Sequence, residues 1–185
     1  MLFTCPICDA DDFKDLDYLR QDKTGFVICR SCGFQTYHPD HRKYKTEESM
    51  LDFYRHEYRR HPNAENLVTS NRKLGYLLTF LSDVLQKDTP EFKKEWKFLD
   101  IGSATGYFLA HLKAFGCDIE NLYGSEYTTT FRNFSKNFYG LKHIYEDIPK
   151  DKQFNFILLN HVLEHMSEPD KKLEFYKSIL SDNGF

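Results

Sequence analysis

Four cysteines near the N-terminus constrain the fold of this chain more than any other feature of its sequence. They form two pairs, Cys5 with Cys8 and Cys29 with Cys32, in a C-x2-C-x20-C-x2-C pattern. Two thiolates with this spacing can curl around one metal ion, and the second pair completes the tetrahedral set that Zn²⁺ prefers. Free thiols or a disulfide pair are the alternatives. The spacing favours a single zinc site.

The segment between the two cysteine pairs has the pattern of a β-hairpin. Residues 12–21 and 26–30 are predicted to be strands, with the turn sequence DKTG between them. A hairpin flanked by cysteine pairs resembles a zinc ribbon, and a module this small depends on metal binding for its folding energy. Residues 1–32 contain six aspartates against four lysines and arginines, so the ribbon is a poor phosphate binder. We expect the ribbon to span residues 1–40.

Residues 41–90 are predicted to form a helical connector. An amphipathic helix is expected over residues 46–60, ending before Pro62, and a second over residues 64–86, where leucines recur at intervals of three, four and seven. Four histidines lie in or near this region, but no two are spaced as a helical i, i+4 pair, and we interpret them as solvated surface residues. They are His38, His41, His56 and His61.

Composition limits the function classes. A chain of 185 residues holds one full core and a small appended module. No apolar run approaches the roughly 18–20 residues of a membrane helix, and the first residues lack a secretory signal, so we expect the reducing cytoplasm. Lys and Arg total 25 against 28 Asp and Glu, and the net charge of −3 gives no general attraction to nucleic acid. Cys117 lies in an apolar stretch, and we expect it to be buried.

Residues 96–109 predict a strand, a glycine-containing turn and a helix, an arrangement typical of ligand-binding sites. A dinucleotide fingerprint would need glycines at positions 102, 104 and 107, but Ala104 and Tyr107 occupy two of them. Asp100 precedes the turn, where it would repel a pyrophosphate. A cationic ligand without phosphate, such as S-adenosylmethionine, suits this acid better.

The sequence LDIGSATGYFL resembles the first motif of class I S-adenosylmethionine-dependent methyltransferases, with Ala104 in place of the middle glycine. The resemblance implies that Glu126, at the end of a second strand over residues 121–127, holds the ribose hydroxyls. A capping role for Glu126 at the following helix is the alternative. A third strand over residues 141–145 leads to Asp147, where the family often places an acid near the adenine amino group.

A fourth strand is expected over residues 153–160, an almost continuous apolar run typical of a strand buried on both faces. The block FNFILLNHVLEHMSEP resembles the fourth-strand motif of the methyltransferase branch that acts on sugars, quinones and other small metabolites. The family strand order 3-2-1-4-5-7-6 implies that Gly102 and His161 face one crevice. The expected fold is therefore α/β, a Rossmann-like parallel sheet with flanking helices over residues 91–185.

The candidate site residues follow from these motifs. For the base that removes a proton from the acceptor, His161 is the first choice, with Glu164 and His165 behind it, although the last two are also suited to bracing the loop. The expected cofactor-binding residues are Asp100, Gly102, Ser103, Ala104, Gly106, Tyr107, Glu126, Tyr127, Asp147 and Asn160.

The predicted acceptor is a small metabolite, such as a nucleotide-linked sugar or a surface-polysaccharide precursor. An RNA methyltransferase and a non-catalytic methyltransferase-like fragment are the alternatives. After a helix over residues 169–181 the sequence ends at the turn that precedes the fifth strand in the family, so we expect either a fragment or a natural short form. Strand four would then have an exposed edge, which predicts either self-association through this edge or poor solubility.

Overall fold

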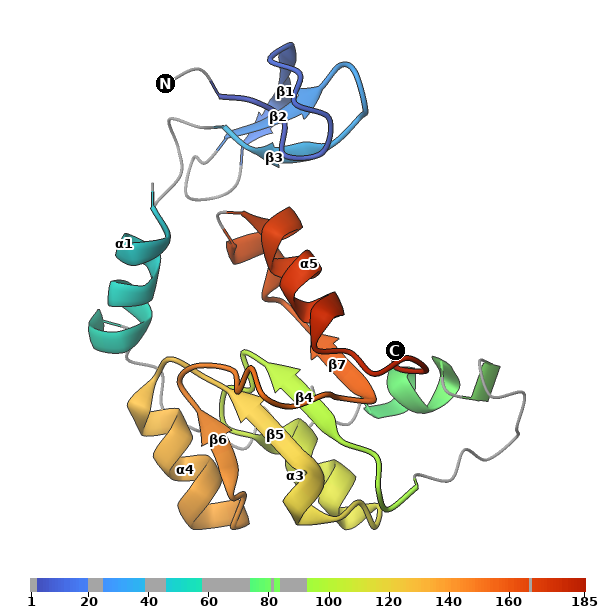
Figure 1. Cartoon of the computed structure of the whole chain (residues 1–185). Helices are drawn as coiled ribbons and strands as arrows, with labels where there is room; N and C mark the ends of the chain where they lie inside the picture. Colours follow the sequence, from blue (N-terminus) through green and yellow to red (C-terminus); the bar gives the residue numbers. More distant parts are fainter. Residues whose placement is uncertain are drawn as a thin grey trace.

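A computed structural model describes residues 3–19, 25–38, 46–57, 74–80, 82–83, 93–166 and 168–185 (Figure 1). The parts of the predicted connector helices at residues 58–60, 64–73, 81 and 84–86 lie outside the described residues. Within the described part of the chain, no helix is long and apolar enough to cross a membrane.

The N-terminal module is a three-stranded antiparallel sheet. Strands β1 (Phe13–Leu19) and β2 (Gly25–Cys29) form the predicted hairpin, and β3 (Gln35–Tyr37) pairs with the other side of β2. Sequence patterning missed β3 because three residues are too few to show a strand period. Val27 and Cys29 are buried, so side chains from β2 and the cysteine cluster form the small core of this module.

The connector begins with helix α1 (Glu47–Asp52), which Thr46 caps. The Thr46 side chain accepts a hydrogen bond from the Ser49 N–H, and the Ser49 hydroxyl oxygen accepts one from the Thr46 N–H. From Phe53 the backbone changes to a π-helical turn, η2 (Phe53–Glu57), where we predicted a continuous α-helix. Such turns are rare in proteins, and many of those that occur lie at functional sites. Residues 74–80 and 82–83 are also helical.

The C-terminal module contains a parallel four-stranded sheet with the order β6-β5-β4-β7. Its strands are β4 (Phe98–Ile101), β5 (Leu122–Ser125), β6 (His143–Tyr145) and β7 (Phe156–Leu159). The helices are α3 (Tyr107–Ala114), α4 (Thr129–Tyr139) and α5 (Pro169–Ser178), with 3-10 turns η3 (Ile119–Asn121) and η4 (Leu163–His165). In chain order these strands are the first to fourth of the module, so the arrangement is the predicted 3-2-1-4.

Two hydrophobic clusters cover the two faces of this sheet. Successive residues of a strand point to opposite faces, and accordingly Phe98 packs with Phe108 and Leu109 of α3, whereas Leu99 packs with Tyr176 of α5. Burial on both faces explains why the strands have apolar runs instead of alternating patterns.

The outer edge of β7 is partly paired. The Ile157 N–H donates a hydrogen bond to the Phe185 carbonyl (2.9 Å), and the Phe185 N–H donates to the Asn155 carbonyl (2.8 Å). Phe154 and Leu180 form a further parallel bridge. The prediction of a bare edge is therefore wrong at these residues, because the C-terminal segment turns back and begins a fifth line of pairing.

Candidate functional site

The candidate site lies where the four parallel strands of the C-terminal module end. The loop at residues 102–106 follows β4, Glu126 follows β5, Glu146 and Asp147 follow β6, and Asn160 follows β7. Since the carboxyl ends of parallel strands meet at one edge of the sheet, this chain order brings the predicted residues together.

The loop after β4 has three residues in the left-handed region of φ. These are Gly102 (φ 66°), Ala104 (φ 48°) and Gly106 (φ 75°). A Cβ atom at Gly102 would lie only 2.6 Å from Cγ2 of Val162, so the loops after β4 and β7 are in close contact. Ala104 adopts its conformation in spite of its side chain, which places local backbone strain in the middle of the loop.

Glu126 is buried, and both of its carboxylate oxygens accept hydrogen bonds from backbone amides. Oε2 accepts from the Ala104 N–H (3.0 Å), and Oε1 accepts from the N–H of Thr128, the N-cap residue of α4 (2.7 Å). Glu126 therefore contacts the backbone just before α4 and is also linked directly to the glycine loop. Burial raises the pKa of this carboxyl, although the two amides and nearby Arg132 act in the opposite direction.

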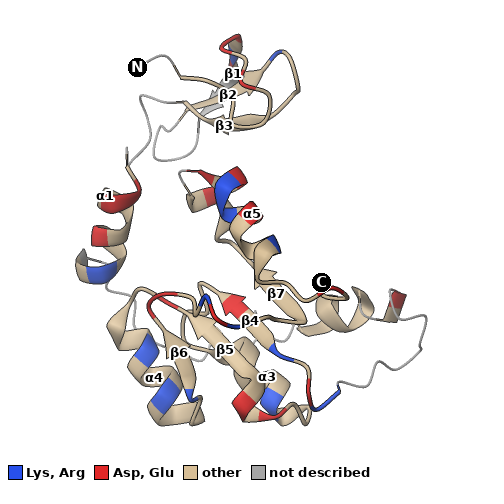
Figure 2. Ribbon diagram, in the orientation of Figure 1, with Lys and Arg blue, Asp and Glu red and all other residues tan. Residues whose placement is uncertain are grey.

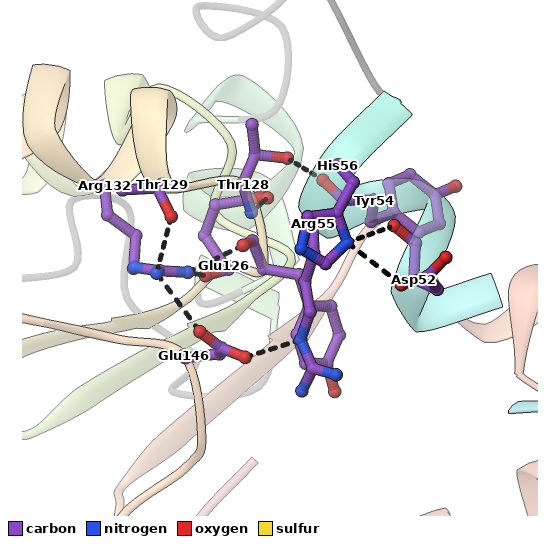
Figure 3. A network of polar contacts seen from close by, with 10 residues as sticks. Asp52, Tyr54, Arg55, His56, Glu126, Thr128, Thr129, Arg132 and Glu146 are labelled. Carbon is purple, nitrogen blue, oxygen red and sulfur yellow. Dashed lines mark hydrogen bonds and ion pairs between the residues drawn. The ribbon is translucent and has the colours of Figure 1, made fainter. Parts of the chain in front are cut away.

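A network of charged side chains surrounds Glu126 (Figure 3). Arg132 donates hydrogen bonds to the Glu126 carbonyl (2.6 Å) and the Tyr127 carbonyl (2.7 Å), and it pairs with Glu146 Oε2 at 3.1 Å. Arg55 of η2 donates to the other Glu146 oxygen, Oε1, at 2.7 Å. Sequence reasoning missed these three residues. The one available signal was the position of Glu146 beside the predicted Asp147.

The connector makes further contacts with the C-terminal module. The Thr128 hydroxyl donates to the Tyr54 carbonyl at 3.2 Å, and the Arg55 guanidinium lies 6.0 Å from the centre of the Tyr127 ring. At the other end of α1, Glu47 pairs with Lys172 of α5 at 2.7 Å. The connector thus bridges α5 and the loops that follow β5 and β6.

The remaining predicted cofactor residues differ in their surroundings. Asp100 is buried in the middle of β4, in register with Gly124 of β5 and Leu158 of β7, whereas Asp147 is exposed. Tyr107 is buried, and its ring packs against Tyr139 of α4 at 5.5 Å, so its side chain belongs to the helix packing.

Two buried polar atoms near the loops lack a hydrogen-bond partner among the described residues, namely Ser103 Oγ and Asn160 Nδ2. Buried polar groups are normally paired, and such exceptions point to a ligand or water. These atoms, the Glu126 carboxylate and the glycine loop form a set of donors and acceptors that fits a ligand with hydroxyl and amino groups, as S-adenosylmethionine has.

The predicted base group lies on the surface. The His161 side chain is 82% exposed, its φ is 55°, and its Nδ1 lies 3.3 Å from Glu164 Oε1. His165 instead lies beside Tyr54 of the connector, with ring centres 6.4 Å apart. The three predicted residues are therefore not one cluster: Glu164 orients His161, and His165 contacts the connector.

A cavity of about 350 Å³ lies beside the candidate site, on the α3 face of the sheet. Its lining is mainly apolar and includes Tyr76, Phe80, Phe108 and Phe156, with Asn160 at one side. This lining does not suit a ribose or a carboxylate, so we do not assign the cavity to the polar part of the cofactor.

In the N-terminal module the four predicted cysteines meet. Their sulfur atoms all lie within 4.8 Å of one another, with Cys5 to Cys32 and Cys8 to Cys29 at 3.6 Å. A disulfide needs a distance of about 2.05 Å, so all four are free thiols here. Cys117 is buried as predicted, and burial raises the pKa of its thiol to about 12.

Comparison with known proteins agrees with this architecture. Residues 68–185 match a family model described as a methyltransferase domain. The chain therefore belongs to this methyltransferase family, and its sheet has the strand order of the class I enzymes. No curated protein matches the sequence at a significant level.

Several solved structures are similar to this chain. Two are plantazolicin methyltransferases in complex with desmethyl analogues of plantazolicin and S-adenosylhomocysteine: BpumL (16% identity) and BamL (17% identity), each with a TM-score of 0.51 and each covering 74% of this chain and 49% of its own. A third is the sugar N-methyltransferase KedS8 from Streptoalloteichus sp. ATCC 53650, with 15% identity, a TM-score of 0.48, and coverage of 68% of this chain and 53% of its own. The chain spans about half the length of these proteins.

Proposed function

We propose that this chain is the cofactor-binding part of an S-adenosylmethionine-dependent methyltransferase that acts on a small metabolite. The observation that supports this most directly is the buried Glu126 carboxylate, held by two backbone amides beside the left-handed loop at residues 102–106. An ionised carboxylate in this position can accept hydrogen bonds from two vicinal hydroxyls, as a ribose presents them.

The other residues have distinct proposed roles. The backbone of the loop from Gly102 to Gly106 would approach the aminoacyl end of the cofactor, with Asp100 as the counter-charge for its ammonium group. Asn160 Nδ2 and Ser103 Oγ, which lack hydrogen-bond partners among the described residues, would form hydrogen bonds with the cofactor. Asp147 would accept a hydrogen bond from the adenine amino group. When bound, the cofactor supplies an electrophilic methyl group on a sulfonium, which is already a good leaving group. The protein then has to position the acceptor and, where needed, take its proton.

We assign the proton transfer to His161. The contact of its Nδ1 with Glu164 would fix which ring nitrogen faces the acceptor, and its exposure leaves the ring accessible. We expect His161→Ala to lower kcat while leaving the Kd for S-adenosylhomocysteine unchanged. An unchanged kcat would remove His161 from the mechanism.

Calorimetric titration with S-adenosylhomocysteine tests the cofactor assignment, with NAD as the competing ligand. Glu126→Ala should weaken binding by about 1.5–3 kcal/mol, the contribution typical of hydrogen bonds to a charged group. Glu120→Gln is the matched control, because Glu120 is an acid of η3, which precedes β5, and it pairs there with Lys142. Binding of NAD without a response to S-adenosylhomocysteine would overturn the proposal.

We also propose that the four cysteines hold one structural Zn²⁺. The support is their mutual distance and the absence of a disulfide between them. Elemental analysis should find one zinc per chain, and Cys29→Ser should abolish it. Protein purified without chelator and lacking zinc would contradict this assignment.

The two alternatives lead to different measurements. In an RNA methyltransferase the ribbon would grip phosphates, but its described residues contain five aspartates against Lys14 and Arg30, and Figure 2 shows acidic residues on this module. Tight, salt-dependent RNA binding would support that alternative. A non-catalytic fragment would bind S-adenosylhomocysteine without turning over any acceptor.

A further inference from the structure

Arg132 occupies a position that is electrostatically unfavourable for a cation. It is the fourth residue of α4, and the N-terminal end of a helix carries a partial positive charge. Its side chain is only 15% exposed, so solvent compensates little of this cost. A cation in such a place must be held by specific partners.

Those partners belong to two of the loops that form the candidate site. Nη1 donates to the carbonyls of Glu126 and Tyr127, directly after β5 (Figure 3). Nη2 contacts Glu146 Oε2 (3.1 Å), directly after β6, and also Thr129 Oγ1 (3.0 Å) in the first turn of α4. The guanidinium therefore fixes the backbone of the residue whose carboxylate we assign to the cofactor. Without it, two carbonyl groups in a largely buried turn would lose their donor.

The geometry of Glu126 is thus determined from two sides. The amides of Ala104 and Thr128 fix the Glu126 carboxylate, and Arg132 fixes the Glu126 backbone carbonyl. We propose that Arg132 is a positioning residue for Glu126, whose side-chain carboxylate binds the cofactor, and that Glu146 orients Arg132 for this task. The inference rests on the proposed function, since it requires Glu126 to bind S-adenosylmethionine.

Lysine is a poor substitute in this role. A guanidinium presents several N–H groups in one plane and can serve two carbonyls and a carboxylate at once, whereas an ammonium is a point charge on a flexible stem. Arg132→Lys therefore keeps the charge but loses the fork. A role that depends on charge alone would be rescued by lysine, and a positioning role would not.

Titration of the full chain with S-adenosylhomocysteine provides the test. For metal ligands, residues that orient the ligating group contribute about 10–100-fold in affinity, and we expect about a tenfold loss for both Arg132→Gln and Arg132→Lys. Glu146→Gln should cost less, about two- to fivefold, the range of a partly exposed ion pair. Lys136→Gln is the matched control, because Lys136 lies one turn further along α4 and is exposed.

A double-mutant cycle separates positioning from a general structural effect. If Arg132 acts through Glu126, Arg132→Gln should have little further effect on the affinity in a Glu126→Gln background. Full tenfold additivity of the two changes would overturn the inference. Fluorescence of Trp96, the single tryptophan, reports whether each variant is folded.

The outcomes for the two proposals are distinct. Wild-type protein that fails to bind S-adenosylhomocysteine would refute the proposed function and, with it, this inference. Wild-type protein that binds while Arg132→Gln and Arg132→Lys bind equally well would refute the inference alone. If Arg132→Gln does not fold, Arg132→Lys and Glu146→Gln provide the same test, and normal affinity in both would refute it.

Discussion

Replacing Gly102 by alanine tests how tightly the loops after β4 and β7 are packed. The substitution has two separate costs. At φ 66° a residue with a Cβ atom is strained by about 1–2 kcal/mol, partly offset by about 0.4–1 kcal/mol because alanine restricts the unfolded chain. The new Cβ would also lie 2.6 Å from Cγ2 of Val162, and overpacking of this kind costs about 1–3 kcal/mol. We expect a total loss of about 2–4 kcal/mol in the free energy of unfolding.

Gly140 offers a matched control for the first cost. Its φ is 67°, almost the same as that of Gly102, but the nearest atom to a Cβ there would be Lys113 Nζ at 3.8 Å. Gly140→Ala should therefore lose only about 1 kcal/mol. The difference between the two variants isolates the steric contact with Val162.

Urea unfolding followed by Trp96 fluorescence is a suitable assay, because Trp96 packs against Phe156 of β7 with ring centres 5.1 Å apart and so reports on the C-terminal module. The double variant Gly102→Ala/Val162→Ala should recover the steric part of the loss. Its total loss of stability should therefore be smaller than the sum of the losses of the two single variants. If Gly102→Ala loses no more than Gly140→Ala, the close contact between the two loops is refuted.

Four other parts of the chain can be tested by substitution, pH titration, alkylation and deletion. Ala104→Gly should not lower the free energy of unfolding, although this exchange ordinarily costs about 0.5–1 kcal/mol, because φ at Ala104 is 48°; urea unfolding checks this. Because burial raises the pKa of Glu126 above its ordinary 4.5, and the ionised form accepts the hydroxyls, affinity for S-adenosylhomocysteine should fall as the pH is lowered through that raised value, and Glu126→Gln should remove this dependence in calorimetry at several pH values. A chelator that removes zinc should unfold the ribbon, so an alkylating reagent should then modify its four thiols quickly, including the buried Cys5 and Cys29, and Cys117 only after the C-terminal module unfolds, as mass spectrometry would show; rapid modification of all five would contradict the burial of Cys117. Light scattering should detect self-association through the outer edge of β7, and deleting Phe185, which pairs with Ile157, should increase it; a monodisperse monomer in both forms would exclude this edge as an interface.

The order of the four parallel strands was predicted through a resemblance, because two motifs, at residues 99–109 and 154–169, resemble those of a family whose strand order is known. The sequence also predicted the meeting of four cysteines, since ligand spacing is a local property. It did not predict the π-helical turn at η2, because a π turn and an α turn have nearly the same hydrophobic period.

The Arg132 network was missed for a different reason. Arg55 and Glu146 are separated by 91 residues, and no local pattern indicates which of many surface charges will meet. The exposure of His161 was equally hidden, because a histidine at the end of a strand has the same sequence context whether it faces the crevice or the solvent. Long-range side-chain geometry is thus the part that patterning could not supply.

The distances along the chain between contacting residues have a consequence for biosynthesis. In the ribbon, Cys5 and Cys32 are only 27 residues apart, so the metal-binding loop can close soon after its last cysteine leaves the ribosome. The partners of the connector are synthesised much later. Thr128 follows Tyr54 by 74 residues, and Glu146 follows Arg55 by 91 residues. Since a chain emerges from its N-terminus, the connector is synthesised directly after a module that can already fold but long before its own binding surface exists. Contacts of such high sequence separation are expected to form late in folding, and the docking of the connector onto the candidate site should be among its last steps.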